Sequence, residues 1–431
     1  MPRSAPTRMQ VSTLHAVVLM LAVVSHGSAQ EPHNAAAEPL IFDTYLPGPC
    51  SPNGQSQGNC VPGTLLRVRL VPIADGLTNP RHVAFLPSGD LLVAELPGRV
   101  SVLRSGARAA APIAGWPLPE LDAVSLHSVL VHPQFARNRL VYLYYVKAPG
   151  DGMTTLALAR GRLEDATLVD VEEIFVADGW MAGGPIAGRA EFGPDGMIYL
   201  TFNDHDRFFS INDTSVRSLA QELGSDIGKV MRLRDDGSAA PDNPFVDRPG
   251  ANPEVYTYGH RNVTGLAWHP RTGELWATEI GAMGGDELNV LRAGQNYGWP
   301  VVSLGKLYNE TDVSEQHWWR PGMEMPVMHW TPSISPSSVA FYTGERFPAW
   351  QGQLFIGTLN GQMLQRVAFG QPEPQAERRE ALFIELGRRF RHVVQGPDGY
   401  LYLATEKRTL SESGTTDVEG SGTLYRLEPA N

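Results

Sequence analysis

Alternating apolar and polar residues restart six times along this chain, each time interrupted by a turn of the Pro-x-Gly kind or a close variant. Alternation with a period of two predicts β-strands, and the turn residues predict that consecutive strands pair as hairpins. The six units are VAFLPSGDLLVAE with GRVSVLR, VLVHPQFARNRLVYLYYV with LALARGRL, AEFGPDGMIYLTFND with GKVMRLRDDG, LAWHPRTGELWATE with DELNVLR, FPAWQGQLFIGTLNGQMLQRV, and VVQGPDGYLYLATE with GTLYRL.

Six restarting sheet units predict an all-β chain folded as a six-bladed β-propeller, in which radial repetition protects the strand edges. A β-sandwich or barrel is the competing architecture, but it would not give a pattern that restarts. Residues 65–74 (LLRVRLVPIA) alternate like a strand and are expected to close the ring against the last unit. The propeller is predicted to span residues 65–431, with the long connections 203–223 and 301–330 building one functional face.

The first 29 residues have the pattern of a cleavable secretory signal peptide. Arg3 and Arg8 form a positive region, residues 14–24 form an apolar core, and Gly27 and Ala29 are the small residues before the expected cleavage point. The core is too short for an ordinary membrane-spanning helix. The sequence therefore predicts a periplasmic or secreted protein whose mature chain has no membrane span.

Residues 30–64 are predicted to form an N-terminal extension that contains both cysteines of the chain, Cys50 and Cys60. In an oxidising compartment, two cysteines that flank a short polar loop are expected to form one disulfide. A redox-active or metal-binding pair is the weaker interpretation, because the chain has no Cys-x-x-Cys motif and no histidine cluster lies nearby.

The composition fits a turn-dense β protein and excludes some classes of partner. The 431 residues include 44 glycines and 34 prolines, which favours sheets and turns over helices. The formal net charge of -11 argues against nucleic acid, since phosphate binding requires clustered Lys and Arg. The chain also has no basic run that could attach it to a membrane surface.

The densest group of candidate functional residues lies within residues 258–300, YGHRNVTGLAWHPRTGELWATEIGAMGGDELNVLRAGQNYGWP. Arg261 and Asn262 occupy a turn, where a rigid scaffold can present side chains to a ligand. A glycine-rich turn precedes Asp286 and Glu287, and outward carbonyls combined with carboxylates suit an oxygen-liking cation such as calcium. The competing interpretation is a turn-rich surface hairpin with a solvated acidic pair, which is the commoner outcome for a short motif.

Several long motifs carry a resemblance to a known family: GLTNPRHVAFLPSGDLLVAELPGRV, HPQFARNRLVYLYYV, GRAEFGPDGMIYLTFND, GKVMRLRDDGSAAPDNPF, YGHRNVTGLAWHP, ELWATEIG, GGDELNVLRAGQNYGWP and GPDGYLYLATE. In these motifs, over residues 76–429, the chain is similar to the soluble glucose/sorbosone dehydrogenases. Those proteins are quinoprotein aldose dehydrogenases that use pyrroloquinoline quinone (PQQ) and calcium. The resemblance implies a six-bladed propeller that oxidises a sugar hydroxyl by hydride transfer to the quinone and passes electrons to an external acceptor.

The resemblance also implies where the quinone and its calcium lie, on top of the propeller. Arg261 and Asn262 match the arginine and asparagine that face the quinone and the substrate. The backbone carbonyls of Gly281 and Ala282 match the ligands of the calcium ion that helps to hold the quinone.

Further positions of the family's site have counterparts in this chain. Arg389 and Arg391 match an Arg-x-Arg pattern that binds the quinone carboxylates, and a bidentate guanidinium suits a planar tricarboxylate. The competing interpretation for these two arginines is a solvated strand end. Asp204 matches an active-site aspartate, while Glu287 and a backbone oxygen near Tyr297 match the ligands of a second, structural calcium.

Three positions depart from the family's pattern. Pro185 stands where the family has its catalytic histidine, and proline has no group that can accept a proton. Ala123 stands at the position of a glutamine that contacts the quinone, and Asn360 at that of a lysine that contacts it. One catalytic group and two cofactor contacts are therefore replaced together.

Two histidines are candidates for a replacement base, since imidazole transfers protons near neutral pH. His205 directly follows the active-site aspartate, and His127 lies at the start of the second unit. A structural or exposed histidine is the competing interpretation for each. Trp330 and Tyr342 of the fifth unit are candidates for stacking on a quinone or a sugar, with a core position as the alternative.

These observations leave three functions open. The first is an exported PQQ-dependent sugar dehydrogenase with a relocated base, favoured by the retained cationic residues. The second is a propeller that has lost the redox chemistry and binds a carbohydrate or a protein, favoured by Pro185, Ala123 and Asn360. The third is a calcium-dependent hydrolase of the lactonase type, because six-bladed propellers also carry that chemistry. The fold by itself does not choose among them.

Overall fold

The computed structural model describes residues 39–45, 65–96, 98–104, 111–117, 120–182, 187–205, 215–314, 318–369, 376–411 and 414–430. The chain divides into two compact units at residue 38, and all described residues belong to the second. The predicted signal peptide, the Cys50–Cys60 disulfide and Pro185 lie outside the described residues.

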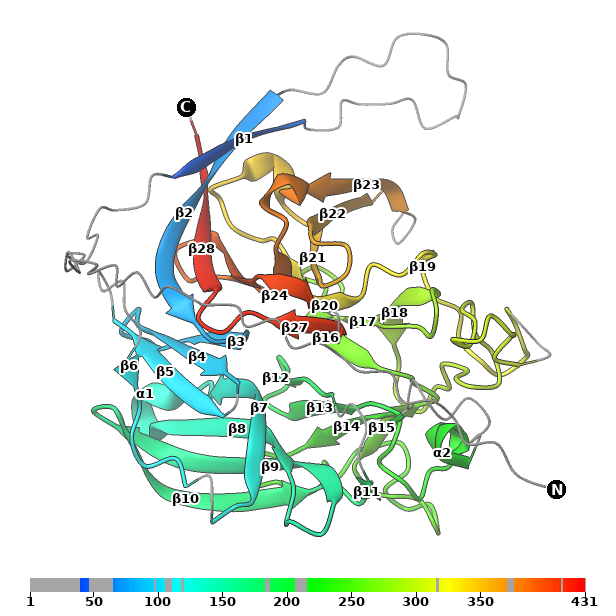
Figure 1. The fold of residues 1–431 in the computed structure, drawn as a ribbon. Helices are drawn as coiled ribbons and strands as arrows, with labels where there is room; N and C mark the ends of the chain where they lie inside the picture. Colours follow the sequence, from blue (N-terminus) through cyan, green and yellow to red (C-terminus); the bar gives the residue numbers. More distant parts are fainter. Residues whose placement is uncertain are drawn as a thin grey trace, which may run out of the picture. The chain divides into compact units, whose positions relative to one another are not determined.

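Six antiparallel sheets form the six blades predicted from the sequence, arranged in a ring (Figure 1), and cavities lie along the central channel of that ring. In the first five blades the strands follow one another in chain order, beginning with the innermost. These strands are β3 (Pro80–Phe85), β4 (Leu91–Glu95), β5 (Arg99–Leu103) and β6 (Ala111–Pro112); β7 (Ala123–Val131), β8 (Leu140–Lys147), β9 (Met153–Glu164) and β10 (Thr167–Val176), with β11 (Met181–Ala182) beside β9; β12 (Ala190–Phe192), β13 (Ile198–Phe202), β14 (Lys229–Leu233) and β15 (Val255–Tyr258); β16 (Val263–Trp268), β17 (Leu275–Glu279), β18 (Asp286–Leu291) and β19 (Met328–Trp330); β20 (Pro336–Phe341), β21 (Leu354–Thr358), β22 (Leu364–Phe369) and β23 (Ala376–Leu382).

The sixth blade closes the ring with strands from both ends of the propeller. Its strands are, from the channel outward, β24 (Arg389–Gln395), β25 (Leu401–Glu406), β28 (Gly422–Pro429), β2 (Leu65–Leu77) and β1 (Leu40–Tyr45). The pairing of β2 with β28 confirms the predicted ring-closing role of residues 65–74. Strand β1 comes from the segment assigned to the N-terminal extension and adds a fifth strand to this blade.

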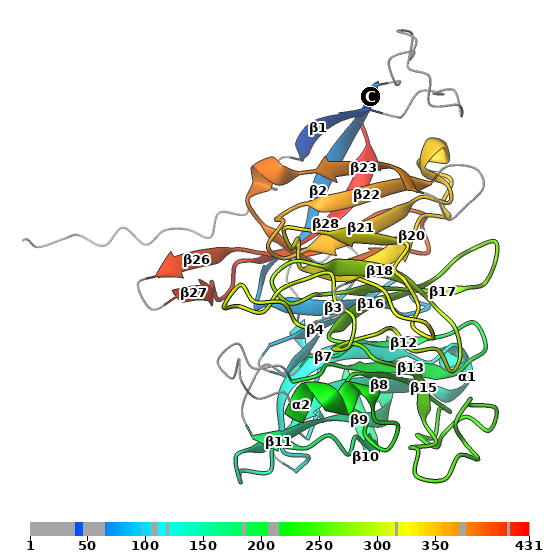
Figure 2. The ribbon, with the colours of Figure 1, turned by 90° about the vertical axis from the view of Figure 1, so that its right-hand side faces the viewer.

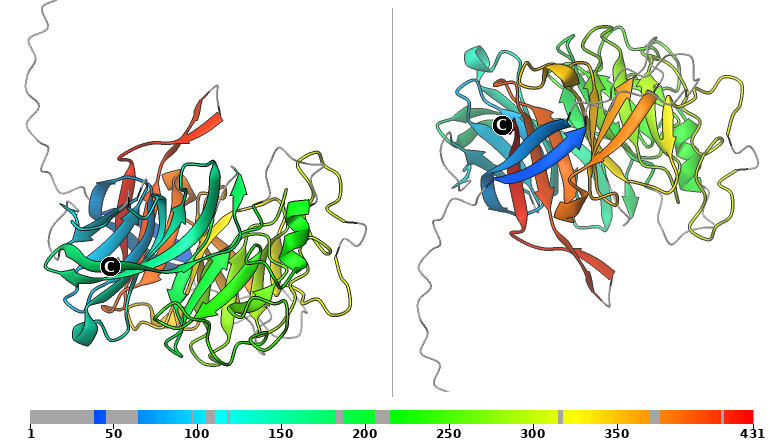
Figure 3. Two further views of the ribbon diagram at one scale, coloured as in Figure 1. Left: turned by 90° about the horizontal axis from the view of Figure 1, so that it is seen from below. Right: turned by 90° about the horizontal axis from the view of Figure 1, so that it is seen from above.

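Among the described residues, helical structure is confined to short segments of three or four residues, two of which are consecutive. These segments are α1 (Phe135–Asn138), α2 (Ser215–Ser218), η1 (Leu219–Gln221), η2 (Pro348–Trp350) and η3 (Ile384–Leu386). Among the described residues, no helix is long and apolar enough to cross a membrane. One hairpin, β26 (Arg408–Ser411) with β27 (Gly414–Asp417), is inserted into the last blade and projects beyond the sheets (Figures 2 and 3).

Side chains of neighbouring blades bind the free edges of some innermost strands. The Val83 N–H donates to His392 Nδ1 at 3.1 Å, and the Val393 N–H donates to Ser338 Oγ at 3.0 Å. Between the second and third blades, the Ala190 N–H donates to Ser128 Oγ at 3.1 Å. Because an unpaired buried amide is costly, these bonds fix the blades to one another around the channel.

Five of the six innermost strands carry a β-bulge at the same level of the channel. The residues skipped by the strand pairing are Arg81 in β3, His127 in β7, Thr264 in β16, Ser337 in β20 and Arg391 in β24. A bulged residue leaves the strict in–out alternation of its strand. All five residues consequently line one small cavity of about 110 Å³ in the middle of the channel.

The buried side chain of Arg189, just before β12, crosses the channel at this level. Its guanidinium donates to three backbone carbonyls, those of Thr264 at 3.0 Å, Arg81 at 3.2 Å and Ser337 at 2.7 Å. Burial lowers the pKa of Arg189 to about 10, so the group keeps its charge at neutral pH. This arginine joins the third blade to three others and separates the two ends of the channel.

Candidate functional site

A pocket of about 520 Å³ lies at the end of the channel where the innermost strands begin. Its polar wall comes from connections and strand ends of the third, fourth, fifth and sixth blades. The charged and amide side chains on this wall include Asp204, Arg261, Asn262, Asn360, Arg389 and Arg408. Three guanidinium groups therefore face one pocket that has a single carboxylate among its described lining residues.

Arg261 and Asp204 are linked through Trp299. The Trp299 indole N–H donates to Asp204 Oδ2 at 2.6 Å, and the Arg261 guanidinium lies over the Trp299 ring, 5.5 Å from its centroid. The backbone adds a second link, because the Asp204 N–H donates to the Arg261 carbonyl at 2.8 Å. A carboxylate and a cation, both nearly buried, are thus held by one aromatic side chain.

The turn that carries Arg261 is fixed from below by a buried carboxylate. Glu279 of β17 accepts a hydrogen bond from the Arg261 backbone N–H and pairs with His260 Nδ1 at 2.9 Å. His260 in turn bonds Thr257 through Nε2 at 2.8 Å and stacks on the Tyr297 ring at a centroid distance of 4.8 Å. Because these partners are buried, the orientation of the turn does not depend on a ligand.

The glycine-rich turn 281–285 lies against Arg261. The Gly281 carbonyl accepts from Arg261 Nη1, and its N–H donates to Asp286 Oδ1 at 3.0 Å. A Cβ at Gly281 would lie 2.3 Å from the carbonyl oxygens of Gly284 and Gly285, so only glycine fits the turn. Ala282 lies on the pocket wall, whereas Gly281 lies behind it.

The acidic residues after this turn form a buried, negatively charged region. Asp286 is held by Ser333 Oγ and by the backbone N–H groups of Ile334 and Ser335, each at 2.8 Å. Burial, followed by the charge of Glu279, raises the pKa of Glu287 to about 8. Asn289 Oδ1, nearby on the same strand, is buried with no hydrogen-bond partner among the described residues. Carboxylate and amide oxygens are ligand types that calcium prefers, and the calcium site stays a prediction.

The two arginines of the Arg-x-Arg pattern do not share one environment. Arg389 lies on the pocket wall, with Nη1 3.5 Å from Glu406 Oε1. Arg391 is the bulged residue of β24, donates from Nε to the same Glu406 oxygen at 2.5 Å, and lines the small cavity under the pocket. Of the two arginines predicted to bind the quinone carboxylates, Arg389 lies in the pocket and Arg391 lies beneath it.

His127 lies in the same small cavity, below the residues that form the pocket floor. Its Nε2 is buried with no hydrogen-bond partner among the described residues. Burial, and then the charges of Arg81, Arg189 and Arg391, hold the pKa of His127 well below its usual value. His127 is therefore a neutral imidazole, and Asn262 and Ala187 line both its cavity and the pocket above.

Three other predicted side chains lie away from the pocket. His205 is fully buried against Phe202, at a centroid distance of 5.1 Å, and its backbone has a positive φ of 55°. Trp330 packs in the hydrophobic cluster between the fourth and fifth blades, and Tyr342 belongs to the core between the fifth and sixth. These positions correspond to the core alternative for Trp330 and Tyr342 and leave His205 without a place on the pocket wall.

The sequence analysis missed two side chains of the site. Arg408, at the base of the β26–β27 hairpin, brings a third guanidinium to the pocket. Its only signal is that the last unit contains an insertion between its second and third strands. Trp299 lies in the aromatic turn that ends residues 258–300, and a Tyr-Gly-Trp-Pro turn beside an active-site motif was the available signal. Ala123 begins β7 and is not among the residues of the pocket wall.

Comparison with known proteins gives a consistent result. A family model described as glucose/sorbosone dehydrogenase matches residues 77–411. The aldose sugar dehydrogenase YliI of Escherichia coli is 33% identical over 372 residues, which cover 84% of this chain and 94% of that protein. The crystal structure of the soluble aldose sugar dehydrogenase from E. coli in the apo form superposes with a TM-score of 0.75 at 31% identity, covering 84% and 100% of the two chains. The PQQ-bound form of an aldose sugar dehydrogenase from Streptomyces coelicolor superposes with a TM-score of 0.64 at 26% identity, covering 84% and 97%.

Proposed function

The chain belongs to the glucose/sorbosone dehydrogenase family, and from this membership we propose that it is a PQQ-dependent sugar dehydrogenase whose active site is the pocket bearing Asp204, Arg261 and Arg389. The single observation that carries the proposal is the convergence of three guanidinium groups on one pocket that also offers amide side chains and one carboxylate. A protein-binding scaffold has no need of such a buried cationic pocket.

The residues present fit a planar polycarboxylate. Arg389 and Arg408 are placed to bind carboxylates, since guanidinium groups form paired hydrogen bonds with them. Asn262 Oδ1 is buried with no partner among the described residues, which suits a donor group on a ligand. When bound, PQQ supplies an electron-accepting quinone that takes a hydride from the sugar carbon.

The chain's own residues would orient the sugar and accept its hydroxyl proton. We assign that proton to Asp204, because it is the one carboxylate among the described residues of the pocket wall. The Trp299 N–H holds Asp204 in place, and Arg261 faces the same space with a positive charge. His127 lies one level lower, and because burial and the neighbouring arginines hold its pKa well below the usual value, it is disfavoured as an acceptor of this proton.

Calcium is proposed at two places. Ala282 at the pocket wall is proposed to supply a backbone oxygen near the quinone, and Gly281 behind it would do so by exchanging the hydrogen bond that its carbonyl accepts from Arg261. Glu287 and a backbone oxygen near Tyr297 are proposed to hold a structural ion; burial first, and then the charges of Glu279 and Asp286, raise the pKa of Glu287, and a bound cation would favour its charged form. Export through a signal peptide and transfer of electrons to an external acceptor stay predictions from the sequence.

Titration of the purified apoprotein with PQQ, with and without calcium, tests the proposal. We expect one quinone to bind per chain, seen as a change in quinone absorbance, and dye reduction with at least one aldose. Arg389→Ala should weaken binding of the quinone, while Arg137→Ala, an exposed arginine on α1, should not. If sugars bind but neither quinone binding nor dye reduction occurs, the protein is a carbohydrate-binding module and the dehydrogenase proposal fails.

A further inference from the structure

The other end of the central channel contains a second concave site, a vestibule of about 400 Å³. The last residue of every innermost strand lines it, so the six blades form its rim. These residues are Phe85, Val131, Phe192, Trp268, Phe341 and Gln395. Four aromatic rings around a cavity of this size resemble the walls of small-molecule sites, which are mainly apolar with a few placed polar groups.

A carboxylate interrupts this apolar wall at one position. Glu191 is the second-to-last residue of β12, and the equivalent residues of β3, β16 and β20 are Ala84, Ala267 and Ala340. All four line the vestibule, and Glu191 is its only carboxylate among the described residues. Packing does not require the charge, since alanine fills the same place in three blades.

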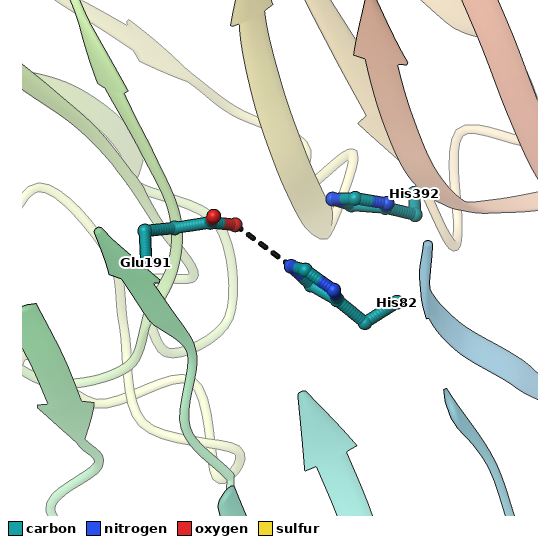
Figure 4. Close-up of side chains that lie close together, drawn as sticks. All are labelled: His82, Glu191 and His392. Carbon is teal, nitrogen blue, oxygen red and sulfur yellow. Dashed lines mark hydrogen bonds and ion pairs between the residues drawn. The ribbon is translucent and has the colours of Figure 1, made fainter. Parts of the chain in front are cut away.

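Two histidines stand beside Glu191 on the floor of the vestibule (Figure 4). His82 Nε2 lies 2.9 Å from Glu191 Oε1, and the rings of His82 and His392 stack with centroids 4.3 Å apart. One atom each of His82, Glu191 and His392 lie within 4.8 Å of one another. In Figure 4 the outer nitrogen of His392 points to the same side as His82 Nε2, where the carboxylate lies.

The hydrogen bonds assign the protons of this cluster. His392 Nδ1 accepts the Val83 N–H, so the ring proton of its neutral form is on Nε2. His82 Nε2 faces a carboxylate and therefore carries its proton there. A metal-binding histidine instead offers a lone pair and donates its other N–H to a neighbour. The bond from Val83 fixes His392 in the opposite arrangement, so His392 offers an N–H donor beside the Glu191 carboxylate.

We propose that this vestibule binds a sugar or cyclic polyol, with one ligand hydroxyl accepting from His392 Nε2–H and donating to Glu191. A hydroxyl both donates and accepts, and an oxygen about 2.8 Å from each group spans a donor and an acceptor less than 5 Å apart. The apolar faces of the ligand ring would pack on Trp268 and Phe85. Because Arg189 closes the channel between the two ends, this site is separate from the candidate active site and does not depend on its redox chemistry.

Methyl α-D-glucoside, which has no free anomeric hydroxyl to oxidise, is the probe for the test. Binding is measured by isothermal titration calorimetry on the full protein carrying Asp204→Asn, which stops oxidation; any sugar binding that remains at the other pocket is the same with and without a change at Glu191 and serves as the internal reference. We expect Glu191→Ala in that background to weaken glucoside binding about tenfold or more, since hydrogen bonds to charged groups contribute at least this much. Trp268→Leu should also weaken glucoside binding, because it removes an aromatic ring from the wall of the vestibule.

The alanines of the other blades make Glu191→Ala a conservative variant, and an unchanged melting temperature confirms that it folds. In the protein without Asp204→Asn, it should leave the KM and kcat of sugar oxidation unaltered. Glucoside affinity that is the same with and without Glu191→Ala overturns the proposal. Binding of one equivalent of Zn²⁺ that Glu191→Ala abolishes, with no glucoside binding, overturns it in favour of a metal site.

Discussion

The two ends of the central channel are built on the same six innermost strands but present different chemistry. Where the strands begin, Arg261, Arg389 and Arg408 face one carboxylate among the described residues, and connections of several lengths supply the wall. Where they end, strand residues themselves form an aromatic rim around Glu191. Loops can vary without changing the ring, whereas each strand end has one fixed place in it. We infer from this contrast that the first end determines the reaction. At the second end a single side-chain difference, Glu191 in place of alanine, would provide a group that binds a ligand.

The largest expected effect is on kcat, because only the pocket where the innermost strands begin is proposed to carry out the reaction. Asp204→Asn keeps an acceptor for the Trp299 N–H but removes the carboxylate, so kcat should fall about 10²–10⁴-fold with a small change in KM. Steady-state dye reduction measures this, with Asp236→Asn as the exposed control. An unchanged kcat would show that the proton leaves by another route, and the assignment of Asp204 would be wrong.

The second effect is on the affinity for PQQ and should also be confined to the pocket where the innermost strands begin. Arg389→Ala should weaken PQQ binding about 10- to 100-fold, because a charged, paired hydrogen bond is lost. Arg389→Lys should recover part of the affinity, since lysine keeps the charge without the planar fork. Absorbance titration of the apoprotein gives both values. Equal affinity in all three proteins contradicts the proposed role of Arg389.

A smaller effect tests whether Trp299 positions the upper site. Trp299→Phe keeps a ring under Arg261 and removes the N–H that Asp204 accepts, so kcat should fall about tenfold. Trp330→Phe is the matched control, because the Trp330 N–H has no hydrogen-bond partner among the described residues. The kcat values of the two variants are measured at the same degree of saturation with PQQ. A similar loss in the two variants would indicate a general packing effect.

The smallest effect concerns acid stability, to which a histidine of the middle cavity and a histidine of the lower vestibule should contribute alike. His127 and His392 are both buried and neutral, and burial holds the pKa of each well below its usual value. The unfolded chain gains protons below about pH 6.5 that the folded chain does not, so folding stability falls as the pH falls through this range. Relative to the native protein, His127→Leu should therefore gain unfolding free energy as the pH falls from 7 to 5, by at most about 1.4 kcal/mol per pH unit.

Denaturant or thermal melts at several pH values make this comparison. His82 and Arg189, which face His392, oppose protonation at the lower end just as Arg81, Arg189 and Arg391 do in the middle cavity. His392→Asn, which keeps an acceptor for the Val83 N–H, should reduce the acid sensitivity in the same direction. Parallel pH profiles for the native protein and His127→Leu would remove His127 as a cause.

The blades could be predicted from the sequence because their signal is local and repeated. Alternation and turn residues define each hairpin, and residues 65–74 retain the pattern of a strand without a partner of their own. The resemblance added Arg261, Asn262, Asn360 and Arg389, which the structure brings together on one pocket wall.

The rest of the site depends on geometry that alternation does not contain. The resemblance places Arg389 and Arg391 together at the quinone carboxylates, and residues two apart on a regular strand do share a face. The bulge of β24 at Arg391 turns that side chain downward. The core position of Trp330 could be predicted only by knowing which face of β19 packs against the fifth blade. Arg408 reaches the pocket from a hairpin inserted in the last blade.

Closure of the ring by β2 and β28 has a consequence for how the chain acquires its structure. Arg69 and Glu428, paired at 2.7 Å, are 359 residues apart in the sequence. Local hairpins can form early, but this contact waits for the whole intervening chain, since distant contacts carry the largest chain-closure cost. The sixth blade can therefore form only after β28 is present, and a chain shortened before Gly422 would keep an open sheet edge.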